Sequence, residues 1–288
     1  MLYGGGMINR FLALAGVITL SLWNLSFQWP VTDPRISSSF GESRWDHFHD
    51  GVDVTSTDMS VRPVAPGRLL FYWDKLMYPL ENYPGSGNYR IISHDGGLYS
   101  IYMHLEDGGG VKAEYGAGDT LGVMGNTGHS FGKHLHFGMI KLAENKSLNP
   151  FPLLPAVEDK KAPVLFECAI RIGDRYFPVK KGTRLRLTQH YPFLIMIQDS
   201  IQGRERLGVT ALTVEMNQRK VYDATFEEIT MNGNSLTVRG KSFSELYDEK
   251  GYYRVASPQY NNGSNTIRIH ASDFAGNETT EEITFDIN

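Results

Sequence analysis

Short apolar runs separated by turn residues dominate the chain from about residue 29 onward. In the first half, such runs cover residues 61–73, 89–93, 98–103 and 135–140. Each is bounded by Gly, Pro, Asp or Asn, and stretches of useful length with a helical period are absent from this half. Short apolar runs between turn residues are typical of β-strands. We therefore predict a β-sheet domain over residues 29–155.

The second half shows a stricter pattern. Apolar and polar residues alternate over residues 209–216, 266–271 and 283–287. Alternation with a period of two predicts strands with one buried face. About seven short strands fit into residues 160–288, and this number favours a β-sandwich of the immunoglobulin-like type. The predicted fold class is thus all-β, with an antiparallel sheet domain followed by a sandwich domain.

Local signals fill in the connections within the second half. Residues 273–277 (DFAGN) lie between two alternating runs and predict a turn. Ser242 and Glu245 have the spacing of a capping box, which predicts a short helix near residues 243–249.

Two further segments predict irregular structure. Residues 149–163 contain four prolines and a charge run, which predicts a linker between the domains. Residues 74–88 carry two prolines and two glycines and predict a long loop. Long loops in compact domains are often functional, so this loop is either a wall of a substrate groove or a plain surface insertion.

The N-terminus predicts export. Arg10 precedes the apolar run of residues 11–23, which is typical of a secretory signal and short for a membrane span. We assign residues 1–28 to a signal peptide. The segment lacks a clear A-x-A cleavage site, so an uncleaved anchor that tethers the protein to a membrane stays open. Either alternative predicts a periplasmic or cell-envelope location.

Composition narrows the function classes. The chain has 41% hydrophobic and 21% charged residues, as expected of a globular protein. Its net charge of −4 and pI of about 6.1 argue against a nucleic-acid partner. Cys168 is the only cysteine, so neither an internal disulfide nor a four-cysteine zinc site can form.

The histidines are unevenly distributed, since seven of the nine lie between residues 47 and 136. His49 and Asp53 are four residues apart, so an extended chain turns both side chains to one face. His134 and His136 flank Leu135, so on a strand both imidazoles face a cleft while the leucine faces the core. His104 ends the run YSIYMHL and can line the same face.

These five residues suit a catalytic metal site. Imidazole nitrogen and carboxylate oxygen are standard zinc ligands, and a catalytic site combines three of them with a water. Three ligands would leave two histidines for acid–base chemistry. The remaining histidines of the cluster have other expected roles: His47 as a neighbour, His94 in a turn, and His129 in a loop or groove lining.

The order of the motifs adds a family resemblance. The segments ISSSFGESR (36–44), HDGVDV (49–54), SGNYRIISHDGG (86–97), YSIYMHL (99–105) and GDTLGVMGNTGHSFGKHLHFGM (118–139) occur in this sequence. Together they resemble the lysostaphin/LytM-type zinc endopeptidases over residues 29–152. One departure is Gly138, where many relatives place Glu; it affects the support of the metal site rather than the ligands.

The resemblance implies both the site and the substrate. It implies that His49, Asp53 and His136 bind one zinc ion, and that His104 and His134 are catalytic. It also implies an antiparallel sheet with the zinc groove on its face, and hydrolysis of peptide bonds in peptidoglycan stem peptides or cross-links. Two alternatives stay open: a silent module that binds peptidoglycan or regulates another hydrolase, and a zinc peptidase that acts on proteins.

Overall fold

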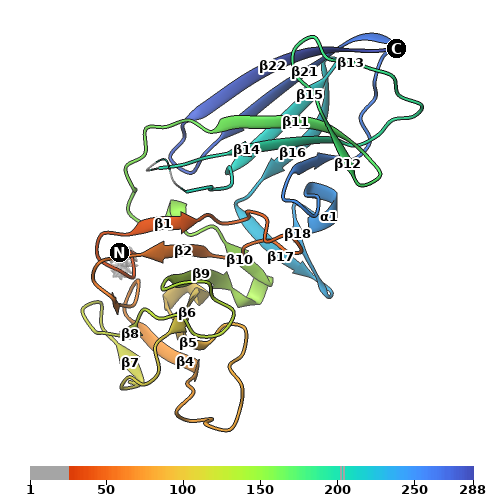
Figure 1. Cartoon of the computed structure of the whole chain (residues 1–288). Coiled ribbons are helices and arrows are strands. Elements are labelled where there is room, and N and C mark those ends of the chain that lie inside the picture. Colours follow the sequence, from red (N-terminus) through yellow and green to blue (C-terminus); the bar gives the residue numbers. More distant parts are fainter. Residues whose placement is uncertain (1–25, 202, 204) are drawn as a thin grey trace, which may run out of the picture.

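The structure is a computed structural model that describes residues 26–201, 203 and 205–288. The signal-peptide prediction falls almost entirely on residues 1–25, outside the described residues. Within the described ranges the regular structure is nearly all β, and α1 (Phe243–Leu246) is the one α-helix (Figure 1). No helix in these ranges has the length and apolar character needed to cross a membrane. The predicted all-β fold is confirmed.

The largest sheet has eleven antiparallel strands. Its main path runs β19 (Lys241–Ser242), β18 (Ser235–Val238), β17 (Glu228–Asn232), β10 (Lys146–Leu148), β9 (Leu135–Lys141), β6 (Tyr99–Leu105), β5 (Asn88–Ser93), β4 (Gly67–Trp73) and β7 (Glu114–Tyr115). β2 (Val52–Thr55) pairs with β9 off this path, and β1 (Arg35–Ser38) pairs with β2. A separate two-stranded sheet joins β3 (Ser60–Val61) to β8 (Gly122–Val123).

The predicted strand pattern explains how β9 is placed. Leu135 and Phe137 are fully buried, and Phe137 packs against Tyr102 of β6 with ring centroids 5.5 Å apart. Because successive side chains on a strand point to opposite faces, His136 points away from these two core residues. The central position of β9, between β6 on one side and β2 and β10 on the other, fixes that face firmly.

Two further sheets make up most of the second half. The four-stranded sheet contains β12 (Arg175–Pro178), β11 (Val164–Ile172), β14 (Phe193–Gln198) and β20 (Tyr253–Val255). The five-stranded sheet contains β13 (Arg184–Leu185), β22 (Glu278–Ile287), β21 (Gly263–Ser272), β15 (Ala211–Met216) and β16 (Arg219–Thr225). Phe193 of β14 stacks on Phe285 of β22 at 5.9 Å, so the two sheets share a core. The immunoglobulin-like assignment and the domain boundaries stay predictions.

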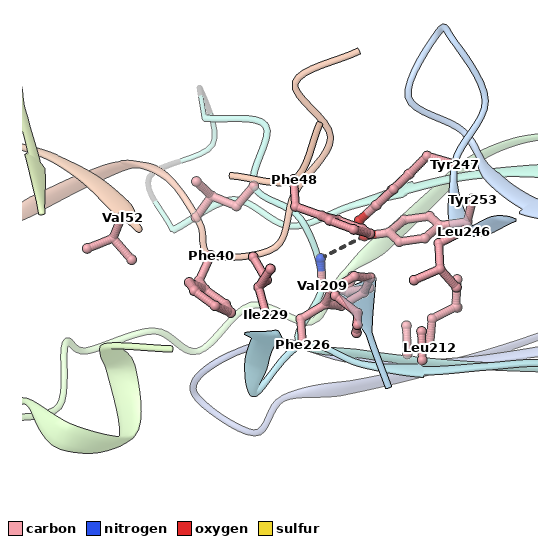
Figure 2. Close-up of a cluster of buried hydrophobic side chains, with 14 of the residues drawn as sticks. Phe40, Phe48, Val52, Val209, Leu212, Phe226, Ile229, Leu246, Tyr247 and Tyr253 are labelled. Atoms are coloured by element: carbon pink, nitrogen blue, oxygen red, sulfur yellow. Dashed lines mark hydrogen bonds between the residues drawn. The ribbon is translucent and has the colours of Figure 1, made fainter. Parts of the chain in front are cut away.

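The two halves of the chain are joined by both backbone and side chains. β17 pairs with β10, so β17–β19 continue the sheet that carries β9 (Figure 1). Figure 2 shows the shared apolar cluster, in which Phe40 and Phe48 lie near Phe226 and Tyr247. Gly41, at φ +79°, sits so close that a Cβ there would lie 2.6 Å from the Phe226 ring. A side chain at this position would therefore separate the two halves.

The local predictions also hold. α1 begins with the predicted capping box, since the backbone N–H of Ser242 donates to the Glu245 carboxylate at 2.8 Å and the Ser242 side chain accepts from the backbone. The segment between β4 and β5 is a long connection that contains no strand. The 273–277 turn is held by the Asp273 carboxylate, which accepts hydrogen bonds from the backbone N–H groups of Ala275 and Asn277.

Candidate metal centre

Three of the predicted site residues meet at the junction of β2 and β9. Asp53 on β2 lies directly opposite His136 on β9 in the antiparallel register. His49 precedes β2, and its ring lies 4.9 Å from that of His136. All three side chains are buried, with exposed fractions of 4%, 6% and 7% for His49, Asp53 and His136. Strand pairing thus brings His136 next to Asp53, although the two are 83 positions apart in sequence, and so adds His136 to the local pair of His49 and Asp53.

The ligating atoms form a nearly equilateral triangle. His49 Nε2 lies 3.0 Å from Asp53 Oδ1 and 3.0 Å from His136 Nδ1, and the third side, from His136 Nδ1 to Asp53 Oδ1, is 3.1 Å. Zinc lies about 2.0–2.2 Å from nitrogen and oxygen ligands. The triangle is small enough for one such ion to contact all three corners, so the residues present fit a metal ion.

The hydrogen-bond arrangement around the triangle supports the same conclusion. His49 Nδ1 lies 2.8 Å from the carbonyl oxygen of Ser39, so Nδ1 carries the proton and donates it. In the neutral ring, Nε2 then presents a lone pair. Asp53 Oδ1 presents lone pairs as well. His136 Nδ1 presents a third lone pair in the tautomer that carries its proton on Nε2, where Asp50 Oδ1 lies 3.5 Å away. A cation at the centre would satisfy all three atoms at once.

Electrostatics also favours positive charge at this point. Burial alone would raise the pKa of Asp53, but His49 and His136 outweigh it and lower that pKa far below its usual value. Burial alone would lower the pKa of His49, and the Asp53 carboxylate outweighs it and raises that pKa. Both shifts mean that the carboxylate attracts a positive partner in a site where water is largely excluded.

Surrounding residues hold the ligands in place. A Cβ at Gly51 would lie 2.7 Å from His136 Nε2 and 2.5 Å from the Phe137 carbonyl oxygen, so the ring of His136 requires glycine there. Arg44 donates to Asp53 Oδ2 at 2.5 Å, which leaves Oδ1 directed into the triangle. Behind His49, the backbone N–H of Gly208 in the second half donates to Ser39 Oγ at 2.8 Å.

The other two predicted site residues lie next to the triangle. The rings of His104 and His134 are 4.9 Å apart, and His134 Nε2 is 3.7 Å from Asp53 Oδ1. His104 Nδ1 donates to the Thr127 carbonyl oxygen at 2.8 Å, and His134 Nδ1 donates to that of Gly132 at 2.9 Å. Each neutral ring therefore keeps a lone pair on Nε2.

His104 is held in an unusual conformation. Its φ of +62° is in the left-handed region, although it ends strand β6 and is not glycine. Its backbone N–H donates to the Ser86 carbonyl oxygen at 2.9 Å, and its side chain bonds Thr127. Such strain persists only where the surroundings enforce it, as they often do at functional sites. Burial, the largest cause, lowers the pKa of His104 to about 4 and keeps the ring neutral.

The five residues line one groove with a volume of about 680 Å³. Gly85 and Ser86 contribute from the 74–88 segment, as one of the two alternatives for that loop predicted. The remaining lining residues are Ser37, Arg44, Trp45, His47, Asp50, Thr55, Met103, His129, Ser130, Phe131, Gly132 and Lys133. A groove of this volume beside a buried triad of ligating atoms can hold part of a peptide chain.

Comparison with known proteins agrees with this arrangement. The family model described as Peptidase family M23 matches residues 47–150, a range that includes all five site residues. We refer to residues 47–150, the range that this model matches, as the M23 domain. A second family model, which carries no functional description, matches residues 167–288.

Individual relatives match the M23 domain rather than the whole chain. DD-carboxypeptidase/endopeptidase Mpg of Neisseria meningitidis is 31% identical over 115 residues, covering 38% of this chain and 25% of the relative. Peptidoglycan DD-endopeptidase ShyA of Vibrio cholerae is 34% identical over 116 residues, covering 39% and 26%. The catalytic domain of lysostaphin from Staphylococcus simulans aligns with a TM-score of 0.34 and 25% identity, covering 41% of this chain and 90% of that domain. The chain thus spans about a quarter of the length of these curated relatives.

His94 and Tyr102 of the M23 domain have structural roles. His94 is buried between the Pro66 carbonyl oxygen and Ser100 Oγ, away from the groove. Tyr102 is fully buried, and its hydroxyl accepts from the Val64 backbone N–H at 2.9 Å, so it belongs to the core. His47 and His129 line the groove without joining the triangle. The ligand and catalytic roles of the five site residues stay predictions, although the structure brings these residues together.

Arg44 is the functional neighbour that sequence reasoning missed. It lies within the quoted segment ISSSFGESR, but its spacing from Asp53 indicates no contact. The contact arises because the loop after β1 folds back over β2, with the backbone N–H of His49 donating to the Glu42 carbonyl oxygen at 2.9 Å. The only available signal in the sequence was that Arg44 is a charged residue within a segment that resembles the family pattern.

Proposed function

We propose that this protein is a zinc-dependent endopeptidase that cleaves peptide bonds in the stem peptides or cross-links of bacterial peptidoglycan. One observation carries the proposal: ligating atoms of His49, Asp53 and His136 lie within 3.1 Å of one another. Two further histidines lie next to them, and all five residues fall within the M23 domain. A relative named as a peptidoglycan endopeptidase supports the substrate class. The predicted export signal is consistent with action in the cell envelope.

The metal would be held by His49 Nε2, Asp53 Oδ1 and His136 Nδ1. When bound, zinc would lower the pKa of a bound water towards about 7 and polarise the scissile carbonyl. Arg44 keeps the Asp53 carboxylate oriented by occupying Oδ2, and the Ser39 carbonyl oxygen keeps the His49 ring in the tautomer that presents Nε2. Hydrogen bonds of this kind to the far side of a ligand fix its orientation and strengthen binding.

His104 and His134 would move protons during the reaction. Both rings are anchored through Nδ1, so both offer Nε2 as an acceptor for the proton of the attacking water. The ring that takes this proton becomes an imidazolium, which can stabilise the developing oxyanion and then protonate the leaving amine. The 4.9 Å separation of the two rings lets them share this task across one reacting centre.

The geometry of the groove supports a peptide substrate. The five site residues line it, and Trp45 and Phe131 are exposed large side chains along the same lining. Exposed aromatic side chains beside a reaction centre provide apolar contacts for a substrate chain. The enzyme would therefore bind an extended peptide across β2, β6 and β9.

A chelation experiment tests the proposal. Purified protein is incubated with peptidoglycan, and release of new amino groups is measured before and after treatment with a zinc chelator. We expect release before treatment, its loss on chelation, and its return when stoichiometric zinc is added. Casein serves as a second substrate, and we expect little release from it.

Two outcomes would contradict the proposal in different ways. Hydrolysis that is unaffected by full removal of zinc would exclude the metal-dependent reaction. Bound zinc without any hydrolysis of peptidoglycan would instead favour a module that binds the cell wall or regulates another hydrolase. Preferential cleavage of casein would overturn the substrate class while leaving the zinc chemistry in place.

A further inference from the structure

A second group of three ligating residues lies outside the M23 domain. Asp159 lies in the segment between the two halves, Asp199 follows β14, and Asp273 begins the turn between β21 and β22. Their carboxylate oxygens lie within 4.8 Å of one another. Asp199 is 2% exposed and Asp273 is 3% exposed, and Asp159 is half-buried. Three separate segments of the chain thus direct negative charge to one point.

The carboxylate of Asp199 has no compensating partner. Both of its oxygens are buried and lack a hydrogen-bond partner, and the same holds for Asp159 Oδ2. Among the residues that the structure describes, none of the three aspartates forms an ion pair with a lysine, arginine or histidine. A buried carboxylate without a partner is costly, because it loses the stabilisation that water provides. Asp199 is also directed toward two other carboxylates, which adds repulsion.

The other two carboxylates are fixed in place by the backbone. Asp273 Oδ1 accepts from the N–H groups of Ala275 and Asn277, at 2.8 and 2.9 Å. The side-chain amide of Asn277 donates both to Asp273 Oδ2, at 2.9 Å, and to the carbonyl oxygen of Asp159, at 3.3 Å. Asp159 Oδ1 accepts from the backbone N–H of Lys161. The cluster is therefore a set of oriented oxygens rather than a group of freely rotating surface side chains.

A shared proton would relieve the repulsion only in part. Burial raises the pKa of Asp199 to about 7, and the nearby negative charges of Asp159 and Asp273 contribute to that rise. A bound cation would neutralise the site far more completely than one proton.

We propose that Asp159, Asp199 and Asp273 bind one calcium ion. Calcium takes six to eight oxygen ligands and prefers carboxylates, whereas this cluster offers neither the nitrogen nor the sulfur that zinc favours. Magnesium demands stricter octahedral geometry and gives up its waters reluctantly. Water would complete the shell beside the three carboxylates. Such an ion would tie the segment that follows the M23 domain to the end of β14 and to the β21–β22 turn.

The test uses the full chain and calcium itself as the probe. Thermal unfolding is followed in metal-depleted buffer and after addition of millimolar calcium, and the heat of calcium binding is measured in parallel. We expect the melting temperature to rise by about 2 °C or more. Asp199→Asn should abolish both the rise and the heat, and without calcium it should be at least as stable as the parent because it removes one of three converging charges.

Control variants make each outcome decisive. Asp174→Asn, on an exposed turn of the same half, should keep the full response, and so should Asp53→Asn in the M23 domain. Should Asp199→Asn not fold, Asp159→Asn at the half-buried position gives the same readout. A parent protein that does not respond to calcium overturns the proposal, as does an Asp199→Asn protein that responds normally. An equal response to magnesium overturns the choice of calcium.

Discussion

The two triads of this molecule, His49–Asp53–His136 and Asp159–Asp199–Asp273, differ in the chemistry of their ligands. In both, the three ligating atoms lie within 4.8 Å of one another, and at least two of the three residues are buried. The first combines two imidazoles with one carboxylate, and the second has carboxylates alone. Neutral imidazoles add no charge, so the first triad carries one negative charge, and the second carries up to three. This difference predicts a borderline transition metal at one site and a hard cation at the other.

The surroundings of the triads differ as much as their ligands. The first opens onto a groove of about 680 Å³ and has two extra histidines beside it. No titratable histidine or lysine of the described residues pairs with the second, and the backbone bonds of Asp273 close a turn. An open position and acid–base groups are what a reaction requires. The comparison therefore separates a proposed catalytic ion from a proposed structural ion.

The largest expected effect comes from removing a ligand of the first triad. His49→Ala removes one of the three proposed zinc ligands, so that only Asp53 and His136 remain. The variant should lose both zinc retention and peptidoglycan hydrolysis. Zinc content is measured by elemental analysis after dialysis, and activity by release of amino groups. The calcium-induced rise in melting temperature should be unchanged, because the second triad is intact.

A surface histidine provides the matched control. His270→Ala removes an exposed imidazole whose contact is Thr280 Oγ1, so zinc content and activity should match the parent. Full activity in a zinc-free His49→Ala protein would refute the assignment of the first triad as the catalytic metal site. Loss of the calcium response in the same variant would show that the two triads are not independent.

A smaller effect is expected from the histidine that lies beside the triangle rather than in it. His134→Ala should keep zinc bound and lower kcat by about 10²–10⁴, the usual contribution of a general acid–base group. His129→Ala, which also lines the groove, should change kcat far less. Loss of zinc from His134→Ala would mean that His134 and His136 have exchanged roles.

Much of the fold followed from local sequence signals. The alternation of β21 and β22, the capping box at Ser242 and the turn at Asp273 depend on residues close in sequence, and all three appear in the structure. The pair His49 and Asp53 was also local. By contrast, the position of His136 opposite Asp53 depends on the pairing of β2 with β9, and only the family resemblance indicated it.

The remaining features depend on contacts between distant segments. No signal in the sequence indicated that β17 pairs with β10 and extends the first sheet. The acidic triad joins three segments, and its members are unremarkable in sequence: one in a charge run, one after a strand, one in a turn. Periodicity reports which face of a strand is buried, but it holds no information about which distant strand or loop lies beside it.

The smallest effect is expected from Arg44, which supports the first triad through a single contact. Arg44→Gln removes the charge that holds Asp53 Oδ2 at 2.5 Å while keeping a hydrogen-bond donor. Loss of such a supporting contact typically weakens metal affinity by about 10–100-fold. We therefore expect a lower zinc affinity in competition with a chelator, and near-normal kcat at saturating zinc. Arg62→Gln, which removes a similar pair with Asp58 outside the groove, should leave zinc affinity unchanged. A kcat that stays low at saturating zinc would instead place Arg44 in contact with the substrate, because reduced metal loading alone could not explain it.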